Sequence, residues 1–330
     1  MKVGIISFAH MHAQSYAFHL IKHPEAELIA IWDDDQDRGN EMAEKFHCSF
    51  YSTLESFLKL DLQAVIICSE NSNHKNHVIA AAKAKKHILC EKPIATSVED
   101  ALEMIQTCQK EGVILQIAYP VRFAPSIRKV KDLIDSGAIG DVIAINGTNH
   151  GQMPGGWFID ERLSGGGAAT DHIVHVMDLI RWMLQDEVKT VYAELDTRFY
   201  DIAVEDCGIV LLELESGVKA TIDPSWSRPK TFPTWGDVTM TIIGTKGTLT
   251  VDAFKQHTVY YNDKDMKISH LPWANDMDEE LINDFLECVK EKRPPFITGV
   301  DGLRTLEVVK AAYQSNELKK PVMINRVEID

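Results

Sequence analysis

The residues of this sequence best placed to do chemistry form a polar stripe on an otherwise apolar segment. Asp171, His175 and Asp178 recur at i, i+4 and i+7 of Asp171–Leu184, so they would share one face of a helix. The rest of the segment is Ile, Val, Met and Leu, which predicts a buried helix whose polar groups need a partner or a function. The positive end of the helix dipole favours a neutral imidazole, so His175 could accept a hydroxyl proton while Asp171 orients it or binds substrate.

Two other interpretations of this stripe stay open. Asp171 and His175 could form a hydrogen-bonded pair that only joins the helix to its preceding loop. A metal site made of Asp171, His172 and His175 is disfavoured, because His172 lies about 100° away from the stripe around the helix.

Lys92 is a second candidate, in Glu91-Lys92-Pro93 directly after the apolar segment His87–Cys90. Ligands of α/β sheets bind at the carboxyl ends of the strands, where this lysine would stand. The residue before a proline has restricted backbone freedom, so the ammonium group would be held in a defined direction. Most lysines are solvated surface charges, so these three residues alone indicate little.

The N-terminal segment could bind a dinucleotide, although it lacks the usual glycines. Ser7, Ala9 and His12 stand where G-x-G-x-x-G would fall; serine and alanine still allow a phosphate to approach, whereas His12 replaces a glycine of tight helix packing. Asp33 ends the next strand about 20 residues on, where an acidic side chain usually holds a ribose. This favours NAD over NADP, a preference that Arg38 could soften. The acidic run at Asp33 could instead cap the helix that follows.

The elements that must position these groups fall into two regions that differ in their pattern of hydrophobic residues. Near-continuous apolar strands alternate with helices over the first 120 residues, which predicts a doubly wound parallel sheet. The expected strands are Lys2–Ser7, Leu28–Trp32, Ala64–Cys68, His87–Cys90 and Ile114–Ala118, with helices within Gln14–Ile21, Asp37–Phe46 and His77–Ala84.

From about residue 121, alternating strands predict an open, mostly antiparallel sheet. The expected strands are Val142–Gly147, Val188–Thr197, Ile209–Glu215, Val218–Asp223, Val238–Ile243 and Thr248–Asp252, with helices Ser126–Asp135, Asp171–Leu184, Asp276–Lys292 and Val300–Asn316. Hairpin turns are expected at Ser216-Gly217 and Gly244-Thr-Lys-Gly247. We therefore expect domains at 1–120 and 121–330, closely coupled, with the C-terminal helix packing back on the first.

Composition excludes several classes of protein. The 330 residues carry 34 Lys+Arg against 49 Asp+Glu, a net charge of −15, which argues against nucleic-acid binding and against docking on an anionic membrane. No apolar run reaches the ~20 residues of a transmembrane helix, and the N-terminus does not read as a signal peptide. Six dispersed cysteines favour a reducing compartment, so we expect a cytoplasmic protein.

Taken together in this order, the motifs are specific although each is modest alone. They are Ala64–Cys68 with Asn71 and His74, Glu91-Lys92-Pro93, Arg122-Phe123-Ala-Pro125, Leu133–Gly140, Gly155-Gly-Trp157-Phe158, Ser164–Gly167 leading to Asp171 and His175, Ser225-Trp226, Gly244–Gly247 and Thr298–Gly302. With them the chain resembles the glucose-fructose oxidoreductase / inositol dehydrogenase (Gfo/Idh/MocA) family along its whole length.

The resemblance implies a Rossmann domain, a C-terminal α/β domain whose open sheet mediates homo-oligomers, and hydride transfer between NAD (NADP as the alternative) and a hydroxyl-bearing carbon of a sugar or polyol. By matching position, Lys92, Asp171 and His175 are implied to be catalytic, with no metal. The implied substrate contacts are Arg122, Trp157 and His172. The implied cofactor contacts are Ser7, Phe8, Ala9, His10, His12, Asp33, Arg38, Ser69, Asn71, His74 and Glu91.

The sequence departs from the family at the three loop glycines, at Glu70 and at His172 and Ile173. Three hypotheses follow. The first is an NAD(P)-dependent dehydrogenase, because the catalytic set is present. The second is a ligand-sensing or regulatory protein that has lost the chemistry, which only the altered loop supports. The third is a sugar eliminase that uses NAD transiently with no net oxidation.

Overall fold

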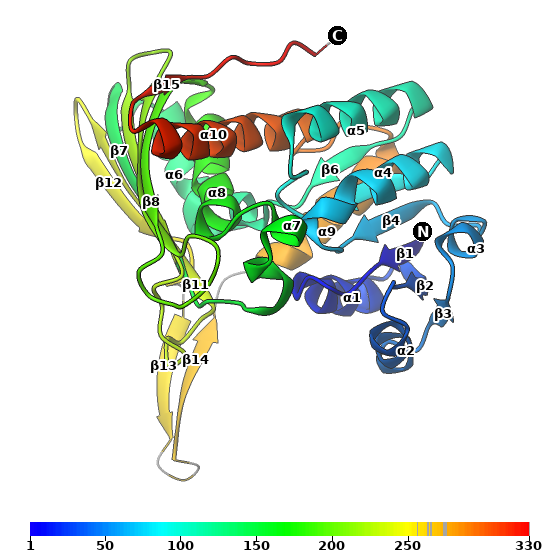
Figure 1. Ribbon diagram of the computed structural model, residues 1–330. Helices are drawn as coiled ribbons and strands as arrows, with labels where there is room; N and C mark the ends of the chain where they lie inside the picture. Colours follow the sequence, from blue (N-terminus) through cyan, green and yellow to red (C-terminus); the bar gives the residue numbers. More distant parts are fainter. Residues whose placement is uncertain (256, 263, 265, 273–275, 330) are drawn as a thin grey trace.

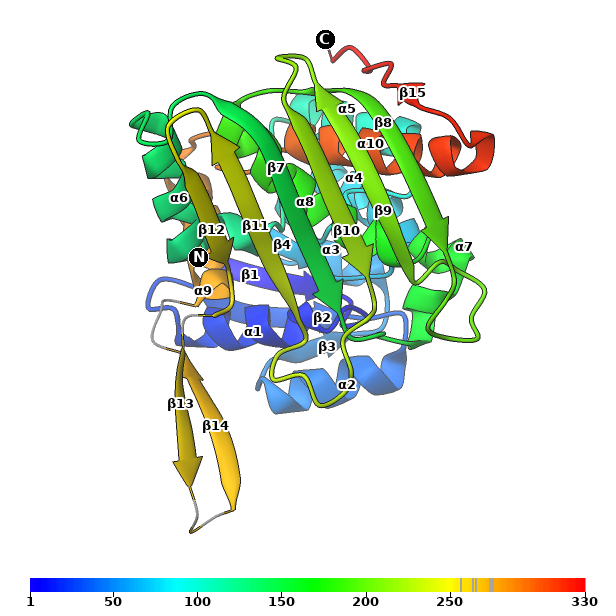
Figure 2. The same cartoon turned by 90° about the vertical axis from the view of Figure 1, so that its left-hand side faces the viewer.

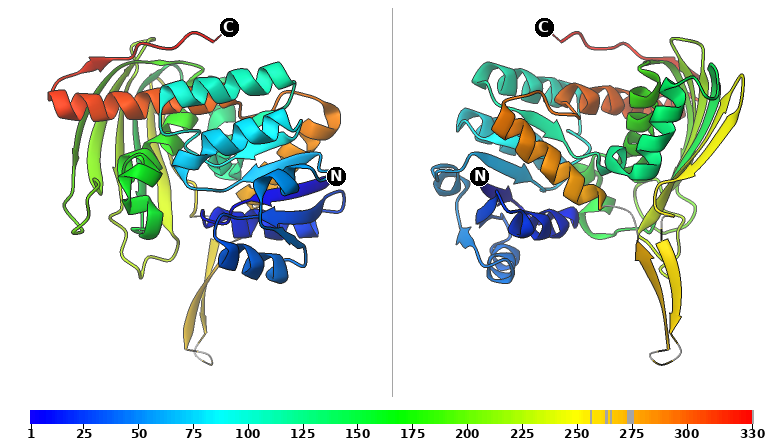
Figure 3. Two further views of the ribbon diagram at one scale, coloured as in Figure 1. Left: turned by 45° about the vertical axis from the view of Figure 1, so that its right-hand side comes forward. Right: turned by 180° about the vertical axis from the view of Figure 1, so that it is seen from behind.

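The computed structural model describes residues 1–329 apart from 256, 263, 265 and 273–275. Two large sheets dominate it, one formed by the N-terminal third of the chain and one by the remainder (Figure 1). Helices of both parts lie between and beside the sheets, as the two views of Figure 3 show.

The first sheet has six parallel strands in the order β3-β2-β1-β4-β5-β6. Successive residues of its central strands, such as Val65 and Ile66, are fully buried, because both faces of the sheet are covered. The predicted doubly wound sheet and its five expected strands are confirmed. The strands are β1 (Lys2–Ile6), β2 (Glu27–Trp32), β3 (Ser49–Tyr51), β4 (Ala64–Ile67), β5 (His87–Cys90) and β6 (Leu115–Ile117).

The helices of this part are α1 (His12–Lys22), α2 (Gln36–Lys45), α3 (Leu54–Leu58), α4 (His74–Lys83) and α5 (Val98–Glu111), with a short 3-10 turn η1 (Asn71–Asn73). The sequence analysis did not identify β3, α3 or α5. β3 has only three residues, too few for a periodic pattern. α5 does carry a start signal, since the Ser97 hydroxyl caps the Asp100 N–H.

The second sheet is mixed, with the order β12-β11-β7-β10-β9-β8-β15. Only β7 and β10 run parallel; the other neighbours are antiparallel, and both predicted hairpin turns are present, between β9 and β10 and between β11 and β12. The strands are β7 (Val142–Gly151), β8 (Val188–Asp196), β9 (Cys207–Leu214), β10 (Lys219–Ser225), β11 (Gly236–Gly244), β12 (Thr248–Asp252) and β15 (Val322–Met323). The expected open, mostly antiparallel sheet is therefore confirmed.

One face of this sheet is covered by helices and the other is open, as Figure 2 shows from the open side. The helices of this part of the chain are α6 (Pro125–Asp135), α7 (Glu161–Ser164), α8 (Ala168–Leu184), α9 (Met277–Glu291) and α10 (Gly299–Leu318), with 3-10 turns η2 (Pro120–Phe123) and η3 (Gly156–Ile159). Of these, α6, α8 and α10 pack against the strands of the second sheet. A hairpin that was not predicted, β13 (His257–Asn262) with β14 (Lys267–Pro272), projects from the body.

The last two helices return to the first sheet. α10 lies beside α5 and approaches β6 closely: a Cβ on Gly302 would lie 2.9 Å from Ile117. Thr305 of α10 shares a 2.6 Å hydrogen bond with the Tyr119 hydroxyl. α9 packs on α1, where the Ser15 hydroxyl donates to Asp278 at 2.6 Å. The two sheets are thus joined by helices as well as by the connection near residue 120.

Candidate active site

A cavity of about 280 Å³ lies where the carboxyl end of β5, the β1–α1 loop and the start of α8 meet. Its walls come from both sheets' parts of the chain, so neither part forms it alone. The lining residues are His10, Met11, His12, Lys92, Gln152, Met153, Pro154, Phe158, Asp171, His172, His175 and Trp235.

The start of α8 is held in place by groups that meet its free backbone N–H donors. Glu205 accepts two backbone N–H groups of this first turn and the Tyr313 hydroxyl. Close packing here requires glycine at Gly166, because φ is +150° and a Cβ would lie 2.0 Å from the Tyr313 hydroxyl oxygen. These contacts fix the first turn of the helix, and Asp171 with it.

Three side chains surround the Asp171 carboxylate. Lys92 Nζ lies 2.5 Å from Oδ1, while Trp226 Nε1 and His172 Nε2 lie 3.1 and 3.2 Å from Oδ2. Burial alone would raise the pKa of Asp171, but Lys92 and His172 hold that pKa well below its usual range. Asp171 is therefore an ionised carboxylate that fixes the direction of the Lys92 ammonium group.

Replacing Trp226 tests this orientation. We expect Trp226→Phe to lower kcat about tenfold, because Asp171 loses one donor and the Lys92–Asp171 pair loses its fixed geometry. Steady-state kinetics with NADH titration measure the effect, and Trp182→Phe, on the far part of α8, is the matched control. Equal losses in both variants would contradict this role of Trp226.

His175 is buried beside this ion pair. Burial first, and then the nearby Lys92 charge, lower the pKa of His175 well below its usual value, so its imidazole is neutral. The sequence analysis expected a neutral ring from the helix dipole; burial and Lys92 are the larger causes. His175 Nδ1 is buried and has no hydrogen-bond partner among the described residues. A neutral imidazole on the wall of the cavity can accept a proton from a bound hydroxyl.

The β1–α1 loop keeps the backbone of a dinucleotide loop without its glycines. Ser7 has φ of +67°, the left-handed conformation that a glycine would adopt freely. Its hydroxyl compensates by accepting the Ala9 N–H at 3.2 Å. α1 begins with no acidic residue in its first turn, but its first N–H groups are paired within the loop: the His12 N–H with His10 Nδ1 at 3.2 Å and the Ala13 N–H with the His10 carbonyl at 3.1 Å. The loop therefore keeps the left-handed turn at its first glycine position, and its binding of a phosphate stays a prediction.

Asp33 and Arg38 form a pair at the expected ribose position. Arg38 donates to both carboxylate oxygens of Asp33, from Nε at 2.9 Å and Nη2 at 2.6 Å, and Nη2 also reaches the Ser7 hydroxyl at 3.3 Å. Asp33 further accepts the Phe8 N–H at 2.7 Å. Helix capping falls to Asp35, which accepts the Asp37 and Arg38 N–H groups. The capping interpretation of the acidic run is thus confirmed for Asp35, and ribose binding by Asp33 stays a prediction.

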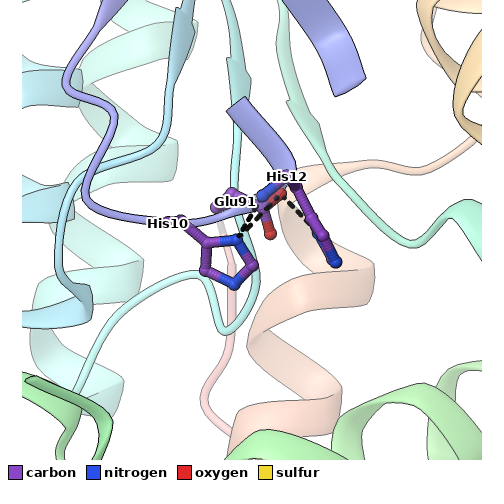
Figure 4. Close-up of side chains that lie close together, drawn as sticks. All are labelled: His10, His12 and Glu91. Carbon is purple, nitrogen blue, oxygen red and sulfur yellow. Dashed lines mark hydrogen bonds and ion pairs between the residues drawn. The ribbon is translucent and has the colours of Figure 1, made fainter. Parts of the chain in front are cut away.

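His10, His12 and Glu91 meet at one buried point (Figure 4). His12 Nδ1 lies 3.0 Å from Glu91 Oε1, and the Tyr16 hydroxyl donates to the same oxygen at 2.7 Å. Burial opposes the charge on His12, but Glu91 raises the pKa of His12 above its usual value. One ligand atom of each residue lies within 4.8 Å of the others, as in a metal site, yet His10 Nδ1 already accepts the His12 N–H. The contacts present are those of a hydrogen-bonded cluster.

The other predicted cofactor contacts lie at the carboxyl ends of β4 and β5. Asn71 donates to the Ser164 carbonyl at 2.8 Å, so it joins the first sheet to the loop before α8. His74 is buried between the carbonyl oxygens of Ser69 and Pro93, and the Ser69 hydroxyl meets His77. These side chains connect the segments that follow β4 and β5 to each other and to the loop before α8.

Two predicted substrate contacts lie elsewhere. Arg122 Nε and Nη2 donate to both oxygens of Asp178 at 2.7 and 2.6 Å in a buried pair, and Asp301 lies 3.1 Å away. The Arg122 guanidinium therefore connects η2 to α8 through Asp178. Arg122 does not line the cavity. Trp157 donates from Nε1 to the Ala9 carbonyl at 3.0 Å, so it contacts the β1–α1 loop. Neither Arg122 nor Trp157 lines this cavity, and their roles as substrate contacts stay predictions.

Several residues of the site were missed from the sequence. Trp226 was noted only as part of a motif, and a tryptophan directly after a buried strand was the available signal. Glu205, Met153 and Trp235 come from loops whose composition carries no signal for a site. Their positions depend on the folded arrangement of η3, α8 and β11.

The six-stranded parallel sheet, with an acidic side chain directly after β2, is typical of a dinucleotide-binding fold. Hydride chemistry on an alcohol needs a proton acceptor, and a neutral imidazole beside a buried Lys–Asp pair is a group of the required kind. Fold and site together define an oxidoreductase that uses a nicotinamide dinucleotide.

Comparison with known proteins identifies the family. Residues 1–119 match the model of the oxidoreductase family with an NAD-binding Rossmann fold, and residues 127–250 match the GFO/IDH/MocA C-terminal domain. The chain belongs to the Gfo/Idh/MocA oxidoreductase family. Among the described residues, no helix has both the length and the hydrophobicity to cross a membrane.

Relatives are similar over nearly the whole chain. The myo-inositol 2-dehydrogenase of Thermotoga maritima is 29% identical over 99% of both chains. The scyllo-inositol 2-dehydrogenase (NAD(+)) of Bacillus subtilis is 27% identical, over 98% of this chain and 95% of its own. A solved probable dehydrogenase from Thermotoga maritima superposes with a TM-score of 0.84 at 27% identity, over 99% of this chain and all of its own.

Proposed function

We propose that this enzyme transfers a hydride between NAD(H) and a hydroxyl-bearing carbon of a neutral sugar or polyol. The observation that carries the proposal is the meeting of Lys92, Asp171 and His175 in one cavity at the carboxyl edge of the first sheet. The dinucleotide, when bound, supplies the hydride chemistry. We assign its binding to the β1–α1 loop, the Asp33–Arg38 pair and the residues that end β4 and β5.

In this proposal the protein's own groups handle the proton. His175, neutral near pH 7, takes the hydroxyl proton during oxidation and returns it during reduction. The Lys92 ammonium group, held by Asp171, donates to the substrate oxygen and stabilises the negative charge that develops there. Asp171 acts by fixing Lys92, and Trp226 and His172 act by fixing Asp171.

The charge of the cavity supports a neutral substrate. Among the described residues that line it, Lys92 is the only lysine or arginine, and Asp171 already pairs with it. Arg122, which could have bound a carboxylate, is engaged by Asp178. Phe158, Met153 and Trp235 form apolar walls suited to the C–H face of a sugar ring or cyclitol.

A substrate panel tests the proposal. We expect NADH formation with one or more of myo-inositol, scyllo-inositol, D-xylose and D-glucose, and none with D-gluconate or glycerate. Turnover of the acids alone would contradict the neutral substrate class. Absence of any NADH or NADPH binding in a fluorescence titration would favour the regulatory alternative, and substrate consumption without NADH accumulation would favour the eliminase.

Arg38 is expected to set the tolerance for NADP. Arg38→Gln removes the cation that neutralises Asp33, so the uncompensated carboxylate repels a 2′-phosphate. We expect NADPH affinity to fall at least about tenfold and NADH affinity to change less. Fluorescence titration with both nucleotides measures this, with the surface variant Arg326→Gln as control. Equal losses for both nucleotides would contradict this role.

We also propose that the chain has two domains. Residues 1–120 bind the cofactor, and residues 121–330 bind the substrate and form homo-oligomers through the open face of the second sheet. That face exposes Ile143, Ile209 and Leu211, and a shallow groove of about 320 Å³ runs across it. A second copy covering this apolar surface would give an oligomer measurable by light scattering; a monomer at micromolar concentration would contradict the assembly.

All six cysteines are unpaired, in keeping with a reducing, cytoplasmic location.

A further inference from the structure

His10 carries a buried hydrogen-bond donor that has no acceptor in the described part of the chain. The residue is 2% exposed and its ring lines the cavity. Its Nδ1 accepts the backbone N–H of His12 at 3.2 Å, and a backbone N–H can only donate. Nδ1 therefore carries a lone pair at this position, and the proton of a neutral ring must be on Nε2.

The surroundings support the neutral ring. Burial lowers the pKa of His10 to about 3, against the opposing effect of Glu91. Glu91 Oε1 is 3.9 Å from His10 Nδ1, too far for a hydrogen bond, and it is already occupied by His12 and Tyr16. No hydrogen-bond partner of His10 Nε2 exists among the described residues.

The free donor of His10 lies on the side of the ring that makes no contact with the Glu91 cluster. Figure 4 shows Nε2 on the side of the ring turned away from Glu91 and His12. Phe158 meets the ring edge-on with centroids 5.4 Å apart, and an aromatic ring is at most a weak acceptor. His10 lines the same cavity as Lys92 and Asp171, whereas Asp33 and Arg38 do not line it. His10 therefore belongs to the Lys92–Asp171 part of the site.

We propose that His10 Nε2–H donates a hydrogen bond to an oxygen of the bound substrate, a hydroxyl or carbonyl oxygen, and so helps to determine substrate specificity. The inference rests on the proposed function, because it assumes that a sugar or polyol occupies this cavity. A site whose buried donor needs an oxygen discriminates strongly against an analogue that lacks this oxygen, because the donor is then left unpaired. Through His10, the β1–α1 loop would recognise the substrate as well as the cofactor.

Two variants of His10 test the proposal. His10→Phe keeps a planar ring without a donor, and His10→Gln keeps both an acceptor for the His12 N–H and a donor. With myo-inositol, scyllo-inositol and D-xylose as substrates, we expect His10→Phe to raise KM about tenfold with a smaller change in kcat. We expect His10→Gln to recover most of this loss, and the rise in KM for the polyol in His10→Phe to exceed any rise in the NADH dissociation constant.

Other outcomes overturn the proposal. A loss of NADH affinity in His10→Phe with KM for the polyol unchanged would assign the donor to the cofactor. Unchanged KM and NADH affinity would show that Phe158 packing suffices for the ring. Binding of Zn²⁺ by the unaltered protein that His10→Phe abolishes would make the three-residue cluster a metal site, with Nδ1 as its ligand.

A spectroscopic experiment needs no turnover and separates this proposal from the proposed function. In protein labelled with ¹⁵N-histidine, we expect the His10 ring nitrogens to show the Nε2–H tautomer between about pH 5 and 8, since its pKa lies far below. The Nε2 signal, assigned by its loss in His10→Gln, should shift when myo-inositol or scyllo-inositol is added to the NADH complex. An Nδ1–H tautomer, or a signal unmoved by a polyol that binds, would contradict the role of His10. Failure of every polyol to bind the NADH complex contradicts the proposed function and the inference that depends on it.

Discussion

His175→Ala is expected to lower kcat by about 10³-fold while the NADH dissociation constant stays within about twofold of the unaltered enzyme. The variant removes a neutral imidazole that lines the cavity beside the Lys92–Asp171 pair, and general acid–base catalysis contributes about 10²–10⁴-fold. His175 Nδ1 has no hydrogen-bond partner among the described residues, so the variant leaves no partner unpaired at that atom. Single-turnover hydride transfer and NADH titration separate the two effects.

The control for His175 is a histidine of the same helix that contacts the carboxylate rather than the reacting oxygen. His172→Gln keeps a donor toward Asp171 and should retain most of the activity. Full activity of His175→Ala would remove His175 from the mechanism, and a parallel loss of NADH binding would make its role structural.

The pH profile gives an independent check on His175. Because its pKa is lowered, the base is neutral over the whole range near neutrality and becomes protonated only when the pH falls well below 6.5. We therefore expect the acid limb of the kcat profile to lie well below pH 6.5. A limb at the ordinary histidine pKa would contradict the buried, neutral ring.

Lys92→Met is expected to abolish turnover and to destabilise the fold. The variant leaves the Asp171 carboxylate buried without its cation, and breaking a buried ion pair by removing one partner costs about 3–5 kcal/mol. Turnover should fall at least about 10³-fold, because the donor to the substrate oxygen is lost and Asp171 has nothing to orient. Urea unfolding measures the free energy of unfolding, and steady-state kinetics measure the activity.

A double variant separates the two effects. Lys92→Met with Asp171→Asn removes both charges and keeps an oxygen for the Trp226 donor, so most of the lost stability should return while the enzyme stays inactive. Equal stability of the single variant and the unaltered protein would contradict the buried pair. Activity in the double variant would contradict the assigned role of Lys92.

The pH dependence of stability has a definite sign at this pair. The pKa of Asp171 is lower in the folded than in the unfolded protein, so the stability that its charge contributes is complete above the ordinary carboxylate pKa. It is lost only as the pH falls below about 4 toward the lowered value. In Lys92→Met burial raises the pKa of Asp171, so the difference in unfolding free energy from the unaltered protein should be largest at pH 8 and should shrink as the pH falls through that raised pKa.

Much of the fold could be predicted from local sequence because local physics decides it. A strand buried on both faces needs successive apolar residues, and Ala64–Ile67 has them. The proposed catalytic set was predictable for a related reason: Asp171 and His175 are polar residues on a buried helix, and Lys92 follows a buried strand. β3 and the projecting β13–β14 hairpin escaped prediction, since three residues carry no period and a hairpin outside the body needs no buried face.

The sequence by itself determined which residues could do chemistry and on which elements they stand, because periodicity and strand ends are local properties. Only the tertiary structure decided what each charge meets. Arg122 is taken by Asp178, although both belong to motifs that suggest a site, because η2 and α8 come together. Trp226 and Glu205 enter the site from distant loops, and the His10 donor lies at Nε2, without a described partner, because His12 occupies the other ring nitrogen. Pairing of buried polar groups depends on distances between segments far apart in the chain, and no local pattern encodes those distances.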